Sequence, residues 1–325
     1  MGLLVDGKWT QDEAGGTDKT GRFERRASSL RNWITPDGAP GPTGEGGFGA
    51  EPGRYHLYVA LACPWAHRTL IFRKLKGLEG MISLSAVHWL MGEDGWSFAE
   101  GLGVIPDPVF SASFMHQVYS AAHPDYTGRV TVPVLFDRKS GRIVNNESSD
   151  IIRMFNSAFD GVGAKAGDFY PAELREEIDA LNERIYGTLN NGVYRAGFAS
   201  SQAAYEEAVW PLFDTLDMLD ARLSSRRYLC GARLTEADWR LFTTLVRFDA
   251  VYHGHFKCNL RRIVDYPNLS AYLRDLYQAP GVAETIDFDH IKNHYYQSHK
   301  RLNPSGVVPV GPVLTLDAPH GRKRL

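Results

Sequence analysis

The apolar residues of the chain follow two kinds of spacing. From residue 51 to about 160, short runs rich in β-forming residues alternate with helical stretches, and from Ala172 onward the spacing is helical. The first apolar run stops at Cys63, a helical pattern begins at Pro64, and a second alternating run follows at 82–89. A β-α-β unit of this kind predicts two parallel strands.

A β-hairpin is predicted after these elements. Residues 129–137 and 142–144 have the composition of strands, and the polar, Gly-containing segment 138–141 between them is typical of a turn. Pro133 lies inside the first of these strands. Because proline has no N–H to donate to a sheet, Pro133 marks an edge, a bulge or a cis bond.

Helices account for most of the remaining chain. One is predicted from Ile151 to Ala158, with Ser148 or Ser149 as its N-cap. The spacing of Thr235 and Asp238 is that of a capping box. Further helices are predicted at residues 172–191, 202–225, 236–251, 268–278 and 287–297.

The segments between and around these elements define the domain organisation. Residues 1–50 are rich in Gly and Pro and predict an irregular extension anchored by Phe23, Trp33 and Ile34. Residues 90–128 form a long insertion, of the kind that serves as a lid or a binding wall. The predicted parts are an extension at 1–50, an α/β domain at 51–160, a helical domain at 172–298, and a tail at 299–325 that is extended or partly disordered.

Composition and charge narrow the classes of partner. The chain has 325 residues, of which 43% are hydrophobic and 23% charged, and its net charge is −2. Without a basic tract, nucleic acid and anionic membrane are excluded as main partners. No apolar run reaches the roughly 18 residues of a spanning helix. Three cysteines far apart predict a reducing, cytoplasmic compartment.

Cys63 is the candidate nucleophile. At the start of a helix, the helix dipole and unpaired N–H groups stabilise a thiolate and lower the pKa of a thiol. The competing interpretation is a small buried apolar residue. Position 66, where a dithiol motif would carry its second cysteine, is Ala66, so a reactive Cys63 needs a thiol from solution. Cys230 and Cys258 lack a redox spacing and are predicted to be structural.

Several other residue types have a structural interpretation beside a functional one. Trp96 is a loop anchor or an aromatic wall over a ligand, and Arg129 could pair with a ligand carboxylate. A tyrosine near a thiolate could donate a proton, but pattern alone selects none of the fifteen tyrosines. Neither the group of His253, His255 and Cys258 nor the pair His290 and His294 has a fourth ligand, so no metal site is predicted. The basic residues Arg68, Arg73, Lys74 and Lys76 are predicted to form a solvated helix face.

The order of elements, with a cysteine after the first strand and a proline in the third, resembles the thioredoxin-like domain of glutathione transferases. Five collinear motifs make the resemblance closer. They are Cys63-Pro-Trp-Ala-His-Arg, Arg129-Val-Thr-Val-Pro-Val-Leu, Asn145-Asn-Glu-Ser-Ser-Asp-Ile, Asn191-Gly-Val-Tyr-Arg-Ala-Gly-Phe-Ala and His294-Tyr-Tyr-Gln-Ser-His. Together they are similar to the glutathionyl-hydroquinone reductases, the xi class of glutathione transferases.

This resemblance implies a fold, a reaction and a set of site residues. The fold is α/β plus all-α: a thioredoxin-like N-terminal domain followed by an all-helical C-terminal domain. Glutathione is the co-substrate, no cofactor is bound, and the protein is a homodimer that reduces glutathionyl-hydroquinones through a mixed disulfide at Cys63. The resemblance makes Tyr194 the proton donor and places Tyr252 and Tyr295 near the thiolate. Its glutathione-binding residues are Trp96, Arg129, Val130, Val132, Pro133, Glu147 and Ser148, with Val132 pairing antiparallel with the glutathione backbone after a cis bond to Pro133.

Two alternatives remain open. One is an omega-like thiol transferase or dehalogenase that acts on mixed disulfides or chlorinated quinols. The other is a non-catalytic binding module, since transferase-like folds also serve in binding and assembly.

Overall fold

The computed structural model describes residues 2–11 and 16–324. The chain forms two compact units, each assembled from three segments. Unit 1 contains the described residues of Met1–Gly15, Ala27–Gly167 and Glu284–Gly306, and unit 2 contains Gly16–Arg26, Asp168–Ala283 and Val307–Leu325 up to residue 324. The predicted domains were continuous ranges, whereas in the structure the segment from Glu284 belongs to unit 1.

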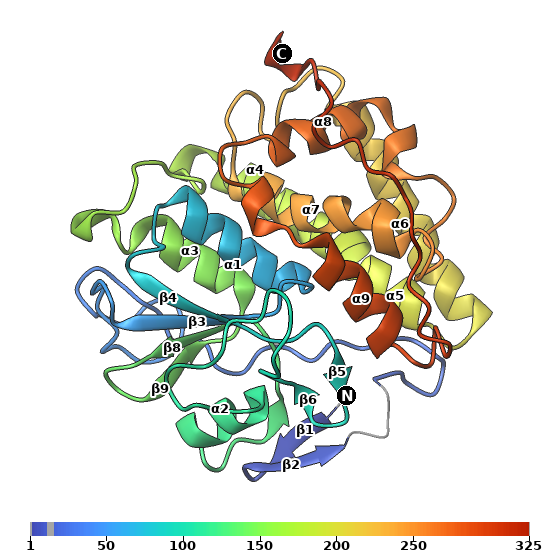
Figure 1. The fold of residues 1–325 in the computed structure, drawn as a ribbon. Helices are drawn as coiled ribbons and strands as arrows, with labels where there is room; N and C mark the ends of the chain where they lie inside the picture. Colours follow the sequence, from blue (N-terminus) through green and yellow to red (C-terminus); the bar gives the residue numbers. More distant parts are fainter. Residues whose placement is uncertain (1, 12–15, 325) are drawn as a thin grey trace. The chain divides into compact units, whose positions relative to one another are not determined.

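Unit 1 holds all the strands and four helices of the described chain. Its elements are β1 (Gly2–Val5), β2 (Lys8–Gln11), β3 (Tyr55–Val59), α1 (Pro64–Leu75), β4 (Ile82–Ala86), β5 (Met91–Gly92), β6 (Gly95–Trp96), α2 (Met115–Ala122), β7 (Gly128–Arg129), β8 (Val134–Asp137), β9 (Arg142–Asn145), α3 (Ser148–Ser157) and α9 (Phe288–Ser298). The central sheet has the order β4-β3-β8-β9. Figure 1 shows α1 and α3 side by side on one face of this sheet.

The strand pairing confirms the predicted β-α-β unit and hairpin. β3 and β4 are parallel, with Leu57 opposite Leu84, and β8 pairs antiparallel with both β3 and β9. β8 begins directly after Pro133, and the Val132–Pro133 bond is cis. Proline therefore stands where pairing starts, at a place that needs no N–H donor.

Two local predictions at the helices of unit 1 were wrong. The N-cap of α3 is Glu147, not a serine, because its carboxylate accepts the Ser149 N–H. The basic residues of α1 do not form one solvated face. Arg68 and Lys76 are buried, and the Lys76 ammonium donates to the Asp160 carboxylate at 2.8 Å. A long aliphatic stem lets such a side chain cross apolar surface while its charged end finds partners.

The N-terminal extension is more regular than predicted. β1 and β2 form a hairpin, and β1 also pairs with β7, with Leu3 opposite Arg129. Of the predicted anchors, Phe23 and Ile34 are buried and Trp33 is half-buried. Residues 12–15 of the predicted extension lie outside the described residues.

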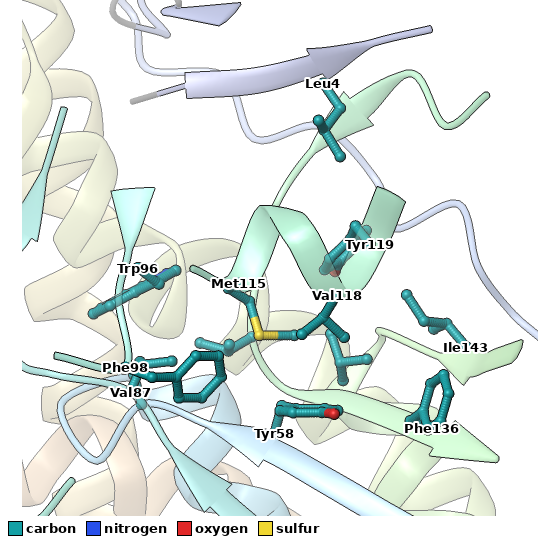
Figure 2. Packing of buried hydrophobic residues seen from close by; sticks show 13 residues of the cluster. Leu4, Tyr58, Val87, Trp96, Phe98, Met115, Val118, Tyr119, Phe136 and Ile143 are labelled. Carbon is teal, nitrogen blue, oxygen red and sulfur yellow. The ribbon is translucent and has the colours of Figure 1, made fainter. Parts of the chain in front are cut away.

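The insertion at 90–128 is built onto the sheet by an apolar cluster. It contains α2 and the small β5–β6 hairpin, neither of which the sequence pattern predicted. Figure 2 shows Met115 and Val118 of α2 packed over Tyr58 of β3 and Phe136 of β8, and all four are buried. This packing fixes the segment that leads into the cis proline.

Unit 2 is helical, and most of its helices lie where they were predicted. They are α4 (Arg175–Ile185), α5 (Gly192–Phe198), α6 (Gln202–Arg222), α7 (Glu236–Arg247) and α8 (Pro267–Tyr277). The capping box at the start of α7 is confirmed, since the Asp238 carboxylate accepts the Thr235 N–H at 2.8 Å. α5 was not predicted. Two π-helical turns, Tyr186–Asn190 and Phe248–Tyr252, continue α4 and α7.

The tail is extended over most of its length, as predicted, and ends in a short 3-10 turn at Arg322–Arg324. Across the described residues, no helix combines the length and apolar character needed to cross a membrane.

Candidate active site

Cys63 stands at the junction of β3 and α1. Its backbone adopts an extended conformation as the N-cap of α1, and Pro64 occupies the first helical position. The Cys63 thiol donates to the Val132 carbonyl at 3.5 Å, and the side chain is half-buried. The structure thus brings the predicted nucleophile beside the predicted cis proline, although 69 residues separate Cys63 from Val132.

The segment from Arg129 to Pro133 runs past this cysteine. Val132 is buried and Val130 is half-buried against the apolar cluster of Figure 2. Arg129 is half-buried in β7. The backbone of this segment therefore lies beside Cys63 at Val132. Its first residue, Arg129, pairs with Leu3 of β1.

Tyr119 is a supporting residue that sequence reasoning missed. Its hydroxyl donates to the Thr131 carbonyl at 3.0 Å and accepts from the Asn146 amide at 3.2 Å. Burial raises the pKa of Tyr119 to about 12, so it remains a protonated donor. The helical spacing of apolar residues at 115, 118 and 119 was the available signal, but the Gly- and Pro-rich insertion around it obscured it. Tyr119 ties the cis-proline segment to the β9–α3 connection.

Glu147 and Ser148 lie at the start of α3. One Glu147 oxygen accepts from the Ser149 N–H and hydroxyl, each at 3.1 Å, and the other accepts from the Ser28 hydroxyl at 3.1 Å. Burial alone would raise the pKa of Glu147, but the Ser149 hydrogen bonds and the Arg68 charge outweigh it, and the net pKa lies below the ordinary value. Glu147 is therefore a fixed carboxylate next to a helix N-terminus.

Arg68 joins the two helices that carry these residues. It lies in α1, is almost completely buried, and donates to the Ser148 hydroxyl at 3.3 Å. Its guanidinium also lies 4.6 Å from the centre of the Trp65 ring. The sequence indicated a solvated residue here, whereas in the structure Arg68 is buried with its guanidinium beside Ser148.

Trp96 is buried and stacks on His294 of α9, with ring centres 4.8 Å apart. This packing supports the interpretation as an anchor of the insertion. A contact of Trp96 with bound peptide stays a proposal.

The three predicted catalytic tyrosines are divided between the two units, one in unit 1 and two in unit 2. Tyr295 is buried in α9 of unit 1, the unit that contains Cys63. Tyr194 of α5 and Tyr252 of a π-helical turn belong to unit 2, where their ring centres are 6.0 Å apart. Arg25 lies over the Tyr194 ring at 4.9 Å. π-helical turns are rare and often occur at functional sites, and here one carries Tyr252 while another leads into α5.

Cys230 and Cys258 are buried, and His290 and His294 contact backbone carbonyls. Burial raises the pKa of the Cys230 thiol to about 11 and that of Cys258 further. His290 and His294 contact the backbone carbonyls of Leu102 and Trp89. Within residues 2–11 and 16–324, no group of three or more His, Cys, Asp or Glu side chains is arranged to hold a metal ion.

Two family models of the glutathione transferases match this chain. Residues 62–158 match the family "Glutathione S-transferase, N-terminal domain", and residues 202–275 match "Glutathione S-transferase, C-terminal domain". The glutathionyl-hydroquinone reductase YqjG of Escherichia coli is 59% identical over 99% of this chain and 98% of its own length. This chain belongs to the glutathionyl-hydroquinone reductases of the glutathione transferase superfamily.

Further relatives agree with this family. The glutathionyl-hydroquinone reductase PcpF of Sphingobium chlorophenolicum is 58% identical over 97% of this chain and 98% of its own. The glutathione-bound structure of YqjG superimposes with a TM-score of 0.92 at 57% identity, covering 99% of both chains. The xi-class transferase of Natrialba magadii superimposes with a TM-score of 0.93 at 50% identity, over 100% of this chain and 98% of that one. The predicted fold class and xi-class membership are confirmed.

Proposed function

We propose that this chain reduces glutathionyl-hydroquinones to hydroquinones, with glutathione as co-substrate and Cys63 as nucleophile. The observation that carries the proposal is the position of the Cys63 sulfur, at the N-terminus of α1 and 3.5 Å from the carbonyl that precedes the cis proline. A helix N-terminus favours the thiolate, which is the attacking form. An extended peptide that pairs with Val132 would place its own sulfur next to this thiolate.

The glutathione part of the substrate is proposed to bind along unit 1. Its γ-glutamyl end carries an ammonium and a carboxylate, and the start of α3 offers a partner for each. The Glu147 carboxylate suits the ammonium, and the N–H groups of the first turn at Ser148 suit the carboxylate. Val132 and Pro133 would bind the cysteinyl backbone. Arg129, Val130 and Trp96 complete the proposed binding residues.

The reaction proceeds in two exchanges at sulfur. First, the Cys63 thiolate attacks the sulfur of the glutathionyl-hydroquinone, and an S–S bond forms while the bond from sulfur to the aromatic carbon breaks. The electron pair stays on that carbon, which takes a proton and becomes part of the hydroquinone. Then a second glutathione, as thiolate, attacks the glutathione sulfur of the mixed disulfide, which releases oxidised glutathione and the Cys63 thiolate. Because the second thiol comes from solution, Ala66 at the resolving position is no obstacle.

The proton for the aromatic carbon is proposed to come from Tyr194. Tyr252 and Tyr295 are proposed to act near the thiolate. A tyrosine hydroxyl can act as a general acid, because its neutral form has a proton to give to the carbon. Replacing Tyr194 by Phe is expected to slow product formation far more than it weakens glutathione binding. Equal losses in both quantities would give Tyr194 a binding role instead.

The deciding experiment is mass spectrometry of the protein after it is mixed with a glutathionyl-hydroquinone and no free glutathione. We expect one glutathione adduct, on the peptide that contains Cys63, together with one equivalent of hydroquinone. Cys230→Ser serves as the control and should form the same adduct. Hydroquinone release without a Cys63 adduct would contradict the mechanism. A small mixed disulfide in place of the substrate tests the omega-like alternative, which requires faster turnover of the disulfide.

We also propose that the protein is a cytoplasmic homodimer. All three cysteines are thiols, as a reducing compartment favours. Trp210 on α6 leaves 56% of its surface exposed, and an apolar side chain of this size is common at protein interfaces. Sedimentation velocity should give twice the chain mass of 36.3 kDa, and a monomer mass would contradict the homodimer.

A further inference from the structure

We propose that the N-terminal extension is part of the glutathione site, with Ser28 and Arg31 as positioning residues that hold Glu147 and the first turn of α3. The inference rests on the proposed function, because it takes Glu147 as a ligand of the γ-glutamyl end. It goes further by assigning a role in that site to residues 28–32, which lie far from the site in sequence.

The extension runs along β9, the edge strand of the central sheet. The Asn32 N–H donates to the Val144 carbonyl at 2.9 Å, and the Asn146 N–H donates to the Leu30 carbonyl at 3.0 Å. These backbone bonds pair the extension with β9 up to the residue before Glu147. The extension therefore lies against the very connection that leads into α3.

Ser28 contacts the Glu147 carboxylate directly. Its hydroxyl lies 3.1 Å from one Glu147 oxygen and 3.2 Å from the Asn146 carbonyl. The other Glu147 oxygen is bound by the Ser149 N–H and hydroxyl. The two oxygens of this carboxylate are thus bound by two different elements. Ser149 of α3 binds one oxygen, and Ser28 of the extension binds the other. This fixes the plane of the carboxylate and leaves a lone pair on the Ser28-bound oxygen for an ammonium.

Arg31 holds the first turn of α3. Its guanidinium makes two hydrogen bonds to the buried Asp150 carboxylate, one of them 2.8 Å from Nη2 to Oδ1 and the other from Nε to Oδ2. The Asn145 side chain donates to the same carboxylate at 3.1 Å. A two-pronged pair of this kind fixes direction as well as distance. Asp150 lies three residues after Glu147, so the pair sets the orientation of the turn that carries Glu147 and Ser148.

A purely structural interpretation is that the extension covers an exposed sheet edge. Backbone pairing at Leu30 and Asn32 is sufficient for that purpose. It does not require the Ser28 hydroxyl to meet the Glu147 carboxylate, or an arginine to make both hydrogen bonds to Asp150. These two side-chain contacts are specific to the residues that start α3, and they are the ones to test.

The test compares Ser28→Ala and Arg31→Gln with wild type in three measurements: the glutathione dissociation constant by calorimetry, KM and kcat for glutathione in the reductase reaction, and the unfolding midpoint. We expect each variant to raise the dissociation constant and KM roughly tenfold, the loss typical of one hydrogen bond to a charged group, while kcat at saturation changes less than about twofold. Ser28→Thr, which keeps a hydroxyl, should restore KM. Arg142→Gln is the matched control, because it removes an exposed ion pair between β9 and Glu45 and should leave KM unchanged.

The possible outcomes separate this inference from the proposed function. If wild type reduces glutathionyl-hydroquinone while Ser28→Ala and Arg31→Gln lower only the unfolding midpoint, the positioning role is overturned and the proposed function stands. If wild type shows no such turnover but both variants weaken glutathione binding, the positioning role stands and the proposed function is overturned. If Arg31→Gln does not fold, Ser28→Ala decides, since it removes only one hydroxyl. Absence of glutathione binding by wild type would overturn both.

Discussion

Two helices of unit 1 begin at residues that the proposed mechanism uses, and their starts are built in opposite ways. α1 begins after Cys63 and α3 after Glu147. Within the described part of the chain, the Cys63 side chain makes no capping hydrogen bond to its helix, whereas Glu147 accepts both the N–H and the hydroxyl of Ser149.

The difference follows from what each residue has to do. A nucleophile needs its charged form stabilised without a donor that occupies the attacking lone pair, and a helix N-terminus supplies this through its dipole. An anchor for a ligand ammonium needs a fixed direction, and several hydrogen bonds supply that. Arg68 connects the two starts, since it lies in α1 and donates to Ser148 in α3.

The Cys63→Ser variant has the largest expected effect. An alcohol at the same helix start is not ionised near neutral pH and cannot form the disulfide. We therefore expect reductase turnover to fall by about 10³-fold or more, while the glutathione dissociation constant stays within about threefold of wild type. Steady-state rates and calorimetry measure the two quantities.

The control for Cys63→Ser is Cys230→Ser. Cys230 is buried and burial raises the pKa of its thiol to about 11, so its replacement should leave turnover unchanged. Near-wild-type turnover in Cys63→Ser would remove Cys63 from the mechanism.

Arg68→Met tests the connection between the helices. The change keeps most of the apolar stem but removes a buried guanidinium, so Ser148 loses a donor and Glu147 a nearby charge. We expect the free energy of unfolding to fall by about 2 kcal/mol. Urea unfolding measures the change.

Lys74→Met on the same helix is the matched control for Arg68→Met. Lys74 pairs with Glu79 and Glu284 at the surface, where an ion pair contributes less than about 1 kcal/mol. Equal losses in the two variants would show that burial of Arg68 has no special role.

Glu147→Gln tests the second helix start. The amide keeps the shape of the side chain but not the charge, so we expect glutathione to bind about tenfold more weakly, or ~1.4 kcal/mol. Calorimetry measures this loss. Glu51→Gln is a control at the other end of β3, where Glu51 pairs with Lys139 in solvent. If Glu147→Gln binds glutathione as tightly as wild type, the γ-glutamyl ammonium is bound by a residue other than Glu147.

The smallest expected effect is a pH dependence of stability. Although burial opposes it, hydrogen bonding from Ser149 and the Arg68 charge lower the pKa of Glu147 below its ordinary 4.5 in the folded protein. Its contribution to stability is therefore complete above pH 4.5 and is lost as the pH falls through the folded value. The stability difference between wild type and Glu147→Gln should shrink in urea unfolding as the pH falls below about 4.5. If the stability difference between the two proteins grows on acidification, the pKa of Glu147 is raised by folding and not lowered.

Much of the fold was readable from local pattern. Alternation and helical spacing located β3, α1, β4, β8 and β9 in their correct order, and Pro64 marked the start of α1. Pro133 was recognised because a missing N–H is a local property. The Thr235–Asp238 capping box was likewise visible, since its partners are three residues apart.

Some errors arose because a distant partner decides the outcome, and others because neighbouring residues hid or shifted the local signal. Serine is the usual N-cap, yet Glu147 caps α3, and Ser28, 119 residues away in sequence, holds its second oxygen. Lys76 looked solvated, but the Asp160 carboxylate and the Gly167 carbonyl accept its ammonium inside the unit. The helix pattern around Tyr119 was hidden by the breakers that surround it.

The sequence by itself determined which segments become strands and helices, and that a cysteine stands at a helix start, because those properties depend on neighbours within a few residues. Only the tertiary structure decided which segments meet there. It set the Val132 carbonyl against Cys63, Tyr119 between Thr131 and Asn146, and the extension against Glu147. Hydrogen bonds between such distant positions leave no periodic trace in the chain, since they form only when packing of the apolar faces brings the segments together.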